Sequence, residues 1–264
     1  MKLTDFGIIF SCVLLCFVTI WGSKCASLNA ISYMNLRYNQ AVDTAVTDAL
    51  FMLVELDDGT KQKFNIEEAK KQFFKTLGIN LNMNSELQEK RLEEYVPIMC
   101  FMLPEGFYIY YNTYVKEENG DLTREYTKSE QHKYVYEDRD YLYEFSFTED
   151  IVVKEKKTDN VYQGCYKDVA RYCNASVLLE ESIFEDMRQR TIAKCVKNKM
   201  SEYGSKYAMY GGEYVVNLPE VNDSMWMRTV DTPGMLAVVQ GLPYYNLETT
   251  YSRVAFGGAR MRKK

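Results

Sequence analysis

The run FGIIFSCVLLCFVTIWG, from Phe6 to Gly22, decides the fold of this chain. Its seventeen residues include no ionisable side chain other than two cysteines. At ~1.5 Å per helical residue they reach about 25 Å, close to the thickness of a bilayer's hydrocarbon core. Trp21 stands where an interfacial aromatic residue is common, and Lys24 follows where a charge can reach the headgroups. The run therefore predicts a membrane anchor with these lipid-facing side chains: Phe6, Ile8, Ile9, Phe10, Val13, Leu14, Leu15, Phe17, Val18, Ile20 and Trp21.

Three interpretations of this run are open. A cleaved secretory signal would use Lys2 as its basic end and would be cut near Ala26. An uncleaved or minimally trimmed signal-anchor would stay in the mature chain. In a soluble protein, the same run would be a buried core helix. The short tail with its positive charge favours a single-pass membrane protein with a cytoplasmic N-terminus and an extracytoplasmic head.

The residues after the run continue a helical pattern. Between Ser27 and Leu56 there is no proline or glycine, and apolar residues recur at helical spacing. Ala41, Ala45 and Ala49 add a ridge that favours close packing of a helix. One continuous helix over residues 6–56 would be about 75 Å long, and a disposable signal has no need of such continuity. We therefore expect a tail and anchor over 1–23, an amphipathic helical stalk over 24–56 and a head over 57–264.

The composition of the chain describes an ordinary water-soluble head behind this anchor. Mean hydropathy is −0.34 and 26% of the residues are charged, which excludes a bundle of membrane helices. The formal net charge of −5 argues against nucleic acid as a partner. The 22 tyrosines suit half-buried sheets and interaction surfaces, because the ring packs while the hydroxyl tolerates water.

The pattern of the head predicts an α+β fold with several helices and a mainly antiparallel sheet. A capping box at Asn65 begins a helix that ends before Gly78, and Pro97 ends a second helix that follows Ser85. Asn119-Gly120 is a strong hairpin signal. Strands are expected at 107–115, 134–136, 141–147, 151–153, 214–218, 235–240 and 251–256, and a helix at 168–200. Residues 157–160 are a candidate domain boundary, although a single head is the preferred interpretation.

Residues that could carry chemistry are few. The seven cysteines form no CxxC pair and have no zinc-like spacing with histidine. Cys165 and Cys173 could form a disulfide in an oxidising compartment, and buried free thiols are the ordinary alternative. His132 is the only histidine, and its polar surroundings predict a solvated surface residue rather than the base of a nucleophile. We therefore expect no catalytic site, no metal site and no cofactor.

The N-terminal organisation resembles type IV pilin-like proteins, in particular the minor pilin-like subunits of tight-adherence pili and of Gram-positive export or conjugation machines. The resemblance rests on a very short tail, an apolar anchor that continues as a long amphipathic helix, and an α+β head. It makes Gly7 the candidate processing residue, because pilins are trimmed after a small residue. Pilins carry glutamate at the fifth position of the apolar run, where this chain has Cys12. This departure suits a minor, capping or initiating subunit better than a bulk one.

The resemblance implies a non-enzymatic structural subunit of a pilus, secretion or conjugation assembly. Its partners would be the lipid bilayer and other protein subunits, contacted through the N-terminal helix and the tyrosine-rich sheet. Two other hypotheses stay open: a single-pass scaffold or docking protein of a transport channel, and a secreted surface adhesion or binding domain. A surface enzyme would need a site that the sequence does not reveal.

Overall fold

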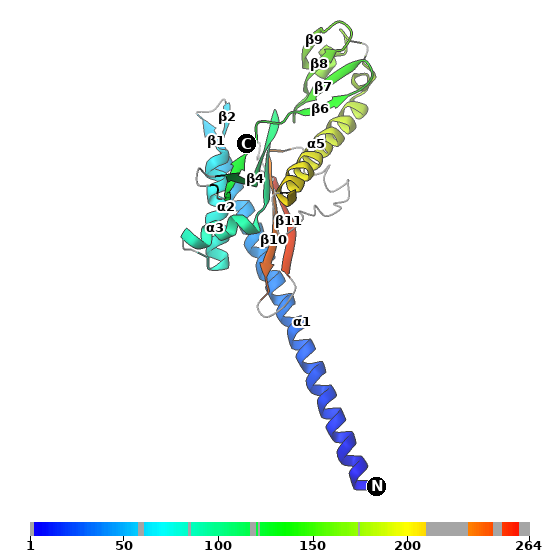
Figure 1. Ribbon diagram of the computed structural model, residues 1–264. Coiled ribbons are helices and arrows are strands. Elements are labelled where there is room, and N and C mark those ends of the chain that lie inside the picture. The colour runs from blue at the N-terminus through cyan, green and yellow to red at the C-terminus, as the bar shows by residue number, and fades with distance from the viewer. Residues whose placement is uncertain are drawn as a thin grey trace.

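A single helix, α1 (Leu3–Leu53), runs from the N-terminus into the head of the molecule (Figure 1). The computed structural model describes residues 3–57, 61–83, 86–116, 120, 122–173, 175–209, 232–244 and 250–258. Within them, the chain is α+β, as expected, with helices and antiparallel sheets behind the long apolar helix. The strand expected at 214–218 lies outside the described residues.

Helix α1 confirms the predicted continuity, but it ends three residues before the expected Leu56. Residues Val54–Asp57 form β1 instead, which pairs antiparallel with β2 (Lys61–Phe64). Asp57 pairs with Lys61, so the chain reverses between them. The residues after Leu53 thus belong to a strand, where the sequence pattern predicted the last turn of the stalk helix.

The centre of the head is a five-stranded antiparallel sheet of order β11-β10-β3-β4-β5. Its strands are β3 (Ile98–Leu103), β4 (Gly106–Lys116), β5 (Leu122–Lys128), β10 (Gly234–Pro243) and β11 (Thr250–Gly258). Three of them confirm predicted strands, whereas β3 and β5 were not predicted. β3 is buried on both faces, so its side chains form a continuous apolar run without the alternation that reveals a half-exposed strand.

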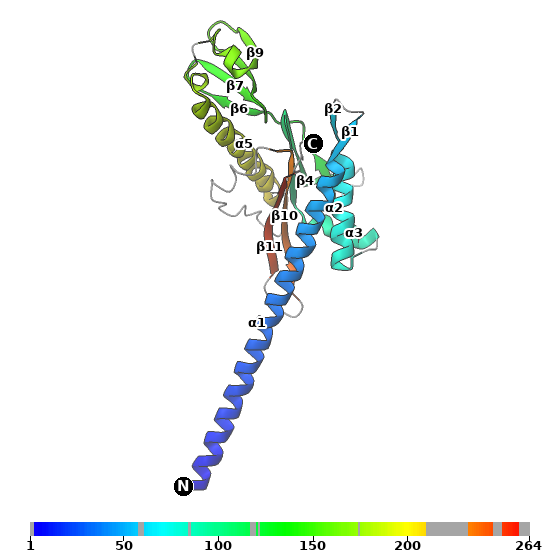
Figure 2. The same ribbon diagram turned by 180° about the vertical axis from the view of Figure 1, so that it is seen from behind.

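Helices cover both faces of this sheet (Figures 1 and 2). On one face, Met99 and Phe101 of β3 pack in a core with α1, α2 (Ile66–Leu81) and α3 (Glu86–Tyr95). On the other face, Ile98 and Cys100 pack in a core with α5 (Glu181–Met209). The backbone N–H of Glu68 donates to Asn65 Oδ1 at 3.2 Å, so the predicted cap of α2 is present.

A four-stranded antiparallel sheet of order β6-β7-β8-β9 packs on the first half of α5, at the end of the molecule away from the N-terminus (Figure 1). Its strands are β6 (Tyr134–Glu137), β7 (Tyr141–Phe145), β8 (Asp150–Glu155) and β9 (Val161–Cys165). The candidate boundary at 157–160 falls between Lys154 and Val161, which pair with each other. Residues 157–160 are therefore the turn of a hairpin and do not separate two domains.

The single helix predicted over 168–200 is wrong. The structure has a short helix α4 (Tyr166–Val169), a 3₁₀ turn η1 (Ser176–Leu178) and then α5. Cys173, Ala175 and Val177 are buried against the four-stranded sheet. Alternate residues of one segment cannot all face the same core from a regular helix, so tertiary burial overrides the local helical preference here.

The second half of α1 is part of the core of the head. The predicted ridge of Ala41, Ala45 and Ala49 is fully or nearly fully buried, with β11 packed against the same helix. A Cβ atom added at Gly257 of β11 would lie 2.4 Å from Val46 Cγ1 and 2.6 Å from a Leu50 Cδ1. Glycine at this position thus permits the close approach of β11 to α1.

Gly257→Ala is expected to destabilise the head by about 1–3 kcal/mol, because the added methyl group must displace a stiff, buried valine. Denaturant unfolding of the full chain measures the change. Gly22→Ala is the matched control, since no atom lies within 4 Å of a Cβ built there. Equal unfolding midpoints for Gly257→Ala and wild type would contradict this packing.

Candidate functional site

The first part of α1 extends from the head without contacting any other described element (Figures 1 and 2). Of the predicted anchor residues, all but Ile9 have described side chains, and each of these is more than half exposed. This helix is the one helix among the described residues that is long and apolar enough to cross a membrane. The candidate processing residue Gly7 lies within its first turns, with nothing near it.

Polar side chains in and near the apolar segment find their partners inside the helix. The hydroxyl of Thr19 donates to the carbonyl oxygens of Leu15 at 3.0 Å and Cys16 at 2.9 Å. The Ser27 hydroxyl donates to the Ser23 carbonyl oxygen at 3.0 Å. These groups therefore require no water, and the segment is compatible with a hydrocarbon environment.

The face of α1 opposite the head is exposed and uncharged. At 100° per residue its members lie opposite the buried alanine ridge. We call this face the outer stripe; it consists of Asn29, Tyr33, Leu36, Gln40, Thr44, Thr47 and Phe51. Two flanking carboxylates are engaged by the head: Asp43 pairs with Arg253 at 3.0 Å, and Asp48 accepts a hydrogen bond from the Thr76 hydroxyl at 2.7 Å. Arg37 is an exposed charge at the border of the stripe. The outer stripe thus presents large uncharged side chains, such as Phe51 at 76% exposure, to whatever lies beside the helix.

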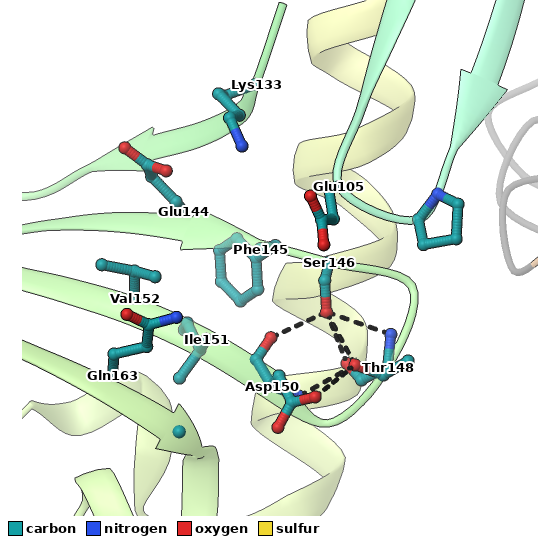
Figure 3. Close-up of a pocket in the computed structure, with 12 residues that line it drawn as sticks. Glu105, Lys133, Glu144, Phe145, Ser146, Thr148, Asp150, Ile151, Val152 and Gln163 are labelled. Atoms are coloured by element: carbon teal, nitrogen blue, oxygen red, sulfur yellow. Dashed lines mark hydrogen bonds between the residues drawn. The ribbon is translucent and has the colours of Figure 1, made fainter. Parts of the chain in front are cut away.

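The head has a shallow hollow of about 550 Å³ on the outer face of the four-stranded sheet (Figure 3). Its lining joins the β3–β4 turn to β7, β8 and β9: Pro104, Glu105, Lys133, Glu144, Phe145, Ser146, Thr148, Asp150, Ile151, Val152, Gln163 and Gly164. The Ser146 hydroxyl donates to the Asp150 carbonyl oxygen at 2.8 Å and accepts from the Thr148 N–H at 3.1 Å. Ser146 therefore holds the β7–β8 turn through hydrogen bonds to the residues of that turn.

His132 is not the solvated residue that its sequence surroundings predict. Its ring is half-buried, 5.3 Å from the ring of Phe107 and 5.7 Å from that of Tyr203. One ring nitrogen lies 3.2 Å from the Tyr203 hydroxyl, and the backbones of His132 and Phe107 exchange two 2.8 Å hydrogen bonds. The histidine thus connects α5 to the central sheet.

Cys165 and Cys173 are free thiols in the structure, so the candidate disulfide is absent. The Cys173 thiol donates to the Val169 carbonyl oxygen at 3.3 Å, while that of Cys165 donates to Glu149 Oε2 at 3.6 Å. Burial raises the pKa of the Cys173 thiol and keeps it protonated. Among the described residues, no group of three His, Cys, Asp or Glu side chains is placed to hold a metal ion.

Several tyrosines of the sheets are core residues and not surface residues. Tyr134 and Tyr143 are fully buried; the Tyr134 hydroxyl donates to the Leu103 carbonyl oxygen at 3.0 Å and that of Tyr143 to Asp138 Oδ2 at 2.7 Å. Burial raises the pKa of the Tyr134 hydroxyl well above its usual value. A share of the tyrosine content therefore stabilises the fold and is unavailable to partners.

A charged cluster connects α2 to the central sheet. Tyr110 of β4 donates a short hydrogen bond to Glu67 of α2. Lys70 lies 3.3 Å from this carboxylate and Lys128 3.6 Å, and the two ammonium groups also lie over tyrosine rings. Burial opposes ionisation of Glu67, but the Tyr110 hydroxyl and the two lysines outweigh it and lower the pKa of the carboxyl. The arrangement is a structural clamp, because its carboxylate is already occupied.

No protein-family model matches the chain, and no curated protein or solved structure is significantly similar to it. Function must therefore be inferred from the geometry of this chain alone. The apolar segment was found from the sequence, but the outer stripe was not. The sequence signal of the stripe is a series of uncharged residues at every third or fourth position from Asn29 to Phe51. The hollow was also not found from the sequence, because its lining runs from Pro104 to Gly164 and has no local pattern.

Glu67→Gln is expected to lower stability at neutral pH by a few tenths to about 1 kcal/mol, since Glu67 is largely exposed. The lowered pKa means that the carboxylate stabilises the fold above about pH 4.5 and loses this effect as the pH falls through its folded pKa. The difference between variant and wild type should therefore shrink towards about pH 3. Denaturant midpoints across this range measure it, with Glu130→Gln as the control. A difference that stays constant with pH would contradict the clamp.

Proposed function

We propose that this chain is a membrane-anchored, non-enzymatic structural subunit, a minor pilin-like component of a pilus, secretion or conjugation assembly. One observation carries the proposal. A single uninterrupted helix is exposed and apolar in its first part and forms the core of the head in its second part.

The apolar side chains in the first part of α1 are exposed, and shielding them from water would be favourable. Each large apolar side chain left in water forgoes about 1.5–3 kcal/mol of burial free energy, and ten such side chains are exposed here. They are distributed around the whole helix rather than along one face. A bilayer covers all sides at once, whereas one partner helix covers a single stripe.

The continuity of α1 favours an anchor that is retained. No proline or glycine separates Ser23 from Leu53, and the hydroxyl of Tyr38 already donates to the Pro243 carbonyl oxygen of the head at 2.7 Å. Ile31 and Met34 already pack on the core of the head, so residues 23–30, about eight residues or roughly 12 Å of helix, separate the apolar segment from the head. With the short tail in the cytoplasm, the head would lie on the extracytoplasmic side.

The outer stripe supports a role in assembly. Its position on the continuation of the anchor would let neighbouring helices pack side by side as subunits leave the bilayer. The threonine hydroxyls of the stripe are bonded within the helix, Thr44 to the Gln40 carbonyl oxygen and Thr47 to that of Asp43, each at 2.8 Å. These two threonine hydroxyls therefore need no partner from a neighbouring helix.

A single-pass scaffold of a transport channel is the second candidate. The observation that favours it is Cys12 at the position where pilins carry glutamate. Such a scaffold would use the same anchor without processing at Gly7, and its head would dock partner proteins.

Replacing both Val13 and Leu14 with Asp should release the full chain from membranes, because each carboxylate at the centre of a membrane helix costs about 2.5–3.5 kcal/mol. Carbonate extraction followed by fractionation measures retention, and protease resistance reports whether the head stays folded. Gln40→Asp on the outer stripe is the matched control and should stay in the membrane. A double variant that remains resistant to extraction would refute the anchor.

The mature protein is expected to retain residues 8–21, which intact mass and N-terminal sequencing can establish. Trimming after Gly7 would support the pilin-like subunit, whereas an intact Met1 would support the scaffold. An N-terminus near Ser27 would show that the apolar segment is a cleaved signal and would overturn both candidates.

A further inference from the structure

The strand β9 is an open edge of the four-stranded sheet. Its neighbour on one side is β8, and no described strand pairs with its other side. The opposite edge, β6, is covered by α5, and the Cys195 thiol donates to the Val135 carbonyl oxygen there at 3.4 Å. The two edge strands of this sheet thus differ: β6 contacts α5, whereas no described strand pairs with the outer side of β9.

Hydrogen bonds at both ends of the β8–β9 pair show which backbone groups point outward. The N–H of Tyr166 donates to the Glu149 carbonyl oxygen, and the N–H of Glu155 to that of Asn160, both at 2.9 Å. Bonded pairs alternate along an antiparallel ladder, so Tyr162 and Gly164 direct their backbone groups to β8. Val161 and Gln163 direct theirs away from the sheet, where a further strand could pair with them.

The free edge lies between two hollows. The larger hollow borders the outer face of the sheet at Gln163, as Figure 3 shows. A second hollow of about 320 Å³ lies beside β9 and α4, lined by Tyr162, Gln163, Asp168, Val169 and Tyr172. Successive side chains of a strand point to opposite faces, so an added strand would send alternate side chains towards the two hollows. Tyr172, at 72% exposure, and Val161, at 59%, add apolar surface beside this edge.

The linings of the two hollows together carry more carboxylates than cations. Their linings contain four carboxylates, those of Glu105, Glu144, Asp150 and Asp168, against one lysine, Lys133. Asp168 also lies 3.4 Å from Arg171 in an exposed pair, which is a weak interaction in water. Lysine or arginine side chains of an incoming strand would be favoured on both faces, and acidic ones disfavoured.

We propose that β9 binds an extended, basic segment of a partner protein, which pairs with Val161 and Gln163 as a fifth strand of the sheet. Backbone hydrogen bonds would supply affinity, and the carboxylates of the hollows would supply the preference for basic side chains on both faces of the added strand. β9 lies at the end of the molecule away from the N-terminus (Figure 1), so α1 leaves it accessible. The proposal does not depend on whether α1 anchors the chain in a membrane.

The test measures binding of the peptide TKKVTKKVT, which places lysines on both faces of an added strand, and of its acidic counterpart TEEVTEEVT to the full chain in detergent, by fluorescence anisotropy. The basic peptide should bind at least roughly ten-fold more tightly. Gln163→Pro should weaken its binding by about ten-fold or more, since proline removes an outward N–H that β8 does not use. Gln163→Thr keeps that N–H and should bind like wild type.

Two further measurements keep the test decisive if Gln163→Pro disturbs the fold. Asp168→Lys should weaken binding of the basic peptide, and the amides of Val161 and Gln163 should exchange more slowly with solvent when that peptide is bound. Equal binding of the two peptides, unchanged binding by Asp168→Lys, or no added protection of these amides would overturn the proposal. Self-association of the chain that Gln163→Pro abolishes would also overturn it, and would assign the edge to a second copy.

Discussion

The structure depends on one helix that must be covered in two different ways. Side chains from Phe6 to Trp21 are apolar around the whole circumference of α1, and no described element packs on them. From Tyr38 onward, the same helix buries only one face, against α2, β10 and β11. Because the helix is continuous, the position and tilt of its first part are passed directly to the head. The apolar segment and the head are therefore joined through one continuous helix, and a tilt of the segment would tilt the head with it.

The burial of the central sheet follows from this arrangement. α1 and α2 cover one face and α5 the other, so β3 is excluded from water on both sides. Its sequence, Ile98 to Leu103, is accordingly uniform in polarity, and a short uniform run does not distinguish a buried strand from a piece of helix. The strands β4, β10 and β11 were predictable from β-branched and aromatic residues near turn signals. Sequence pattern thus recovered β4, β10 and β11, and missed the central β3 and also β5, whose charged residues mask it despite the Asn119-Gly120 turn signal before it.

The remaining differences between expectation and structure share one physical origin. The segment from Ala170 to Glu180 leaves the predicted helix because Cys173 and Val177 are buried on the four-stranded sheet. His132 is half-buried because α5 brings Tyr203 to it from 71 positions along the chain. The hollow exists because the β3–β4 turn meets the end of another sheet. Each depends on a partner distant in sequence, which local propensity does not report. The apolar segment was predictable because seventeen consecutive residues define it without any partner.

The distribution of tyrosine separates what stabilises the head from what it can offer to partners. Tyr110, Tyr134 and Tyr143 have buried rings, with hydroxyls bonded inside the protein, so replacing them would damage the fold before it affected any interface. The groups still available for contact are of two other kinds: the uncharged side chains of the outer stripe and the outward backbone of β9. They lie on separate parts of the molecule, one along α1 and one at the end away from the N-terminus. Neither surface obstructs the other, so if both are binding surfaces, the stripe along α1 and the edge at β9 could be occupied at the same time.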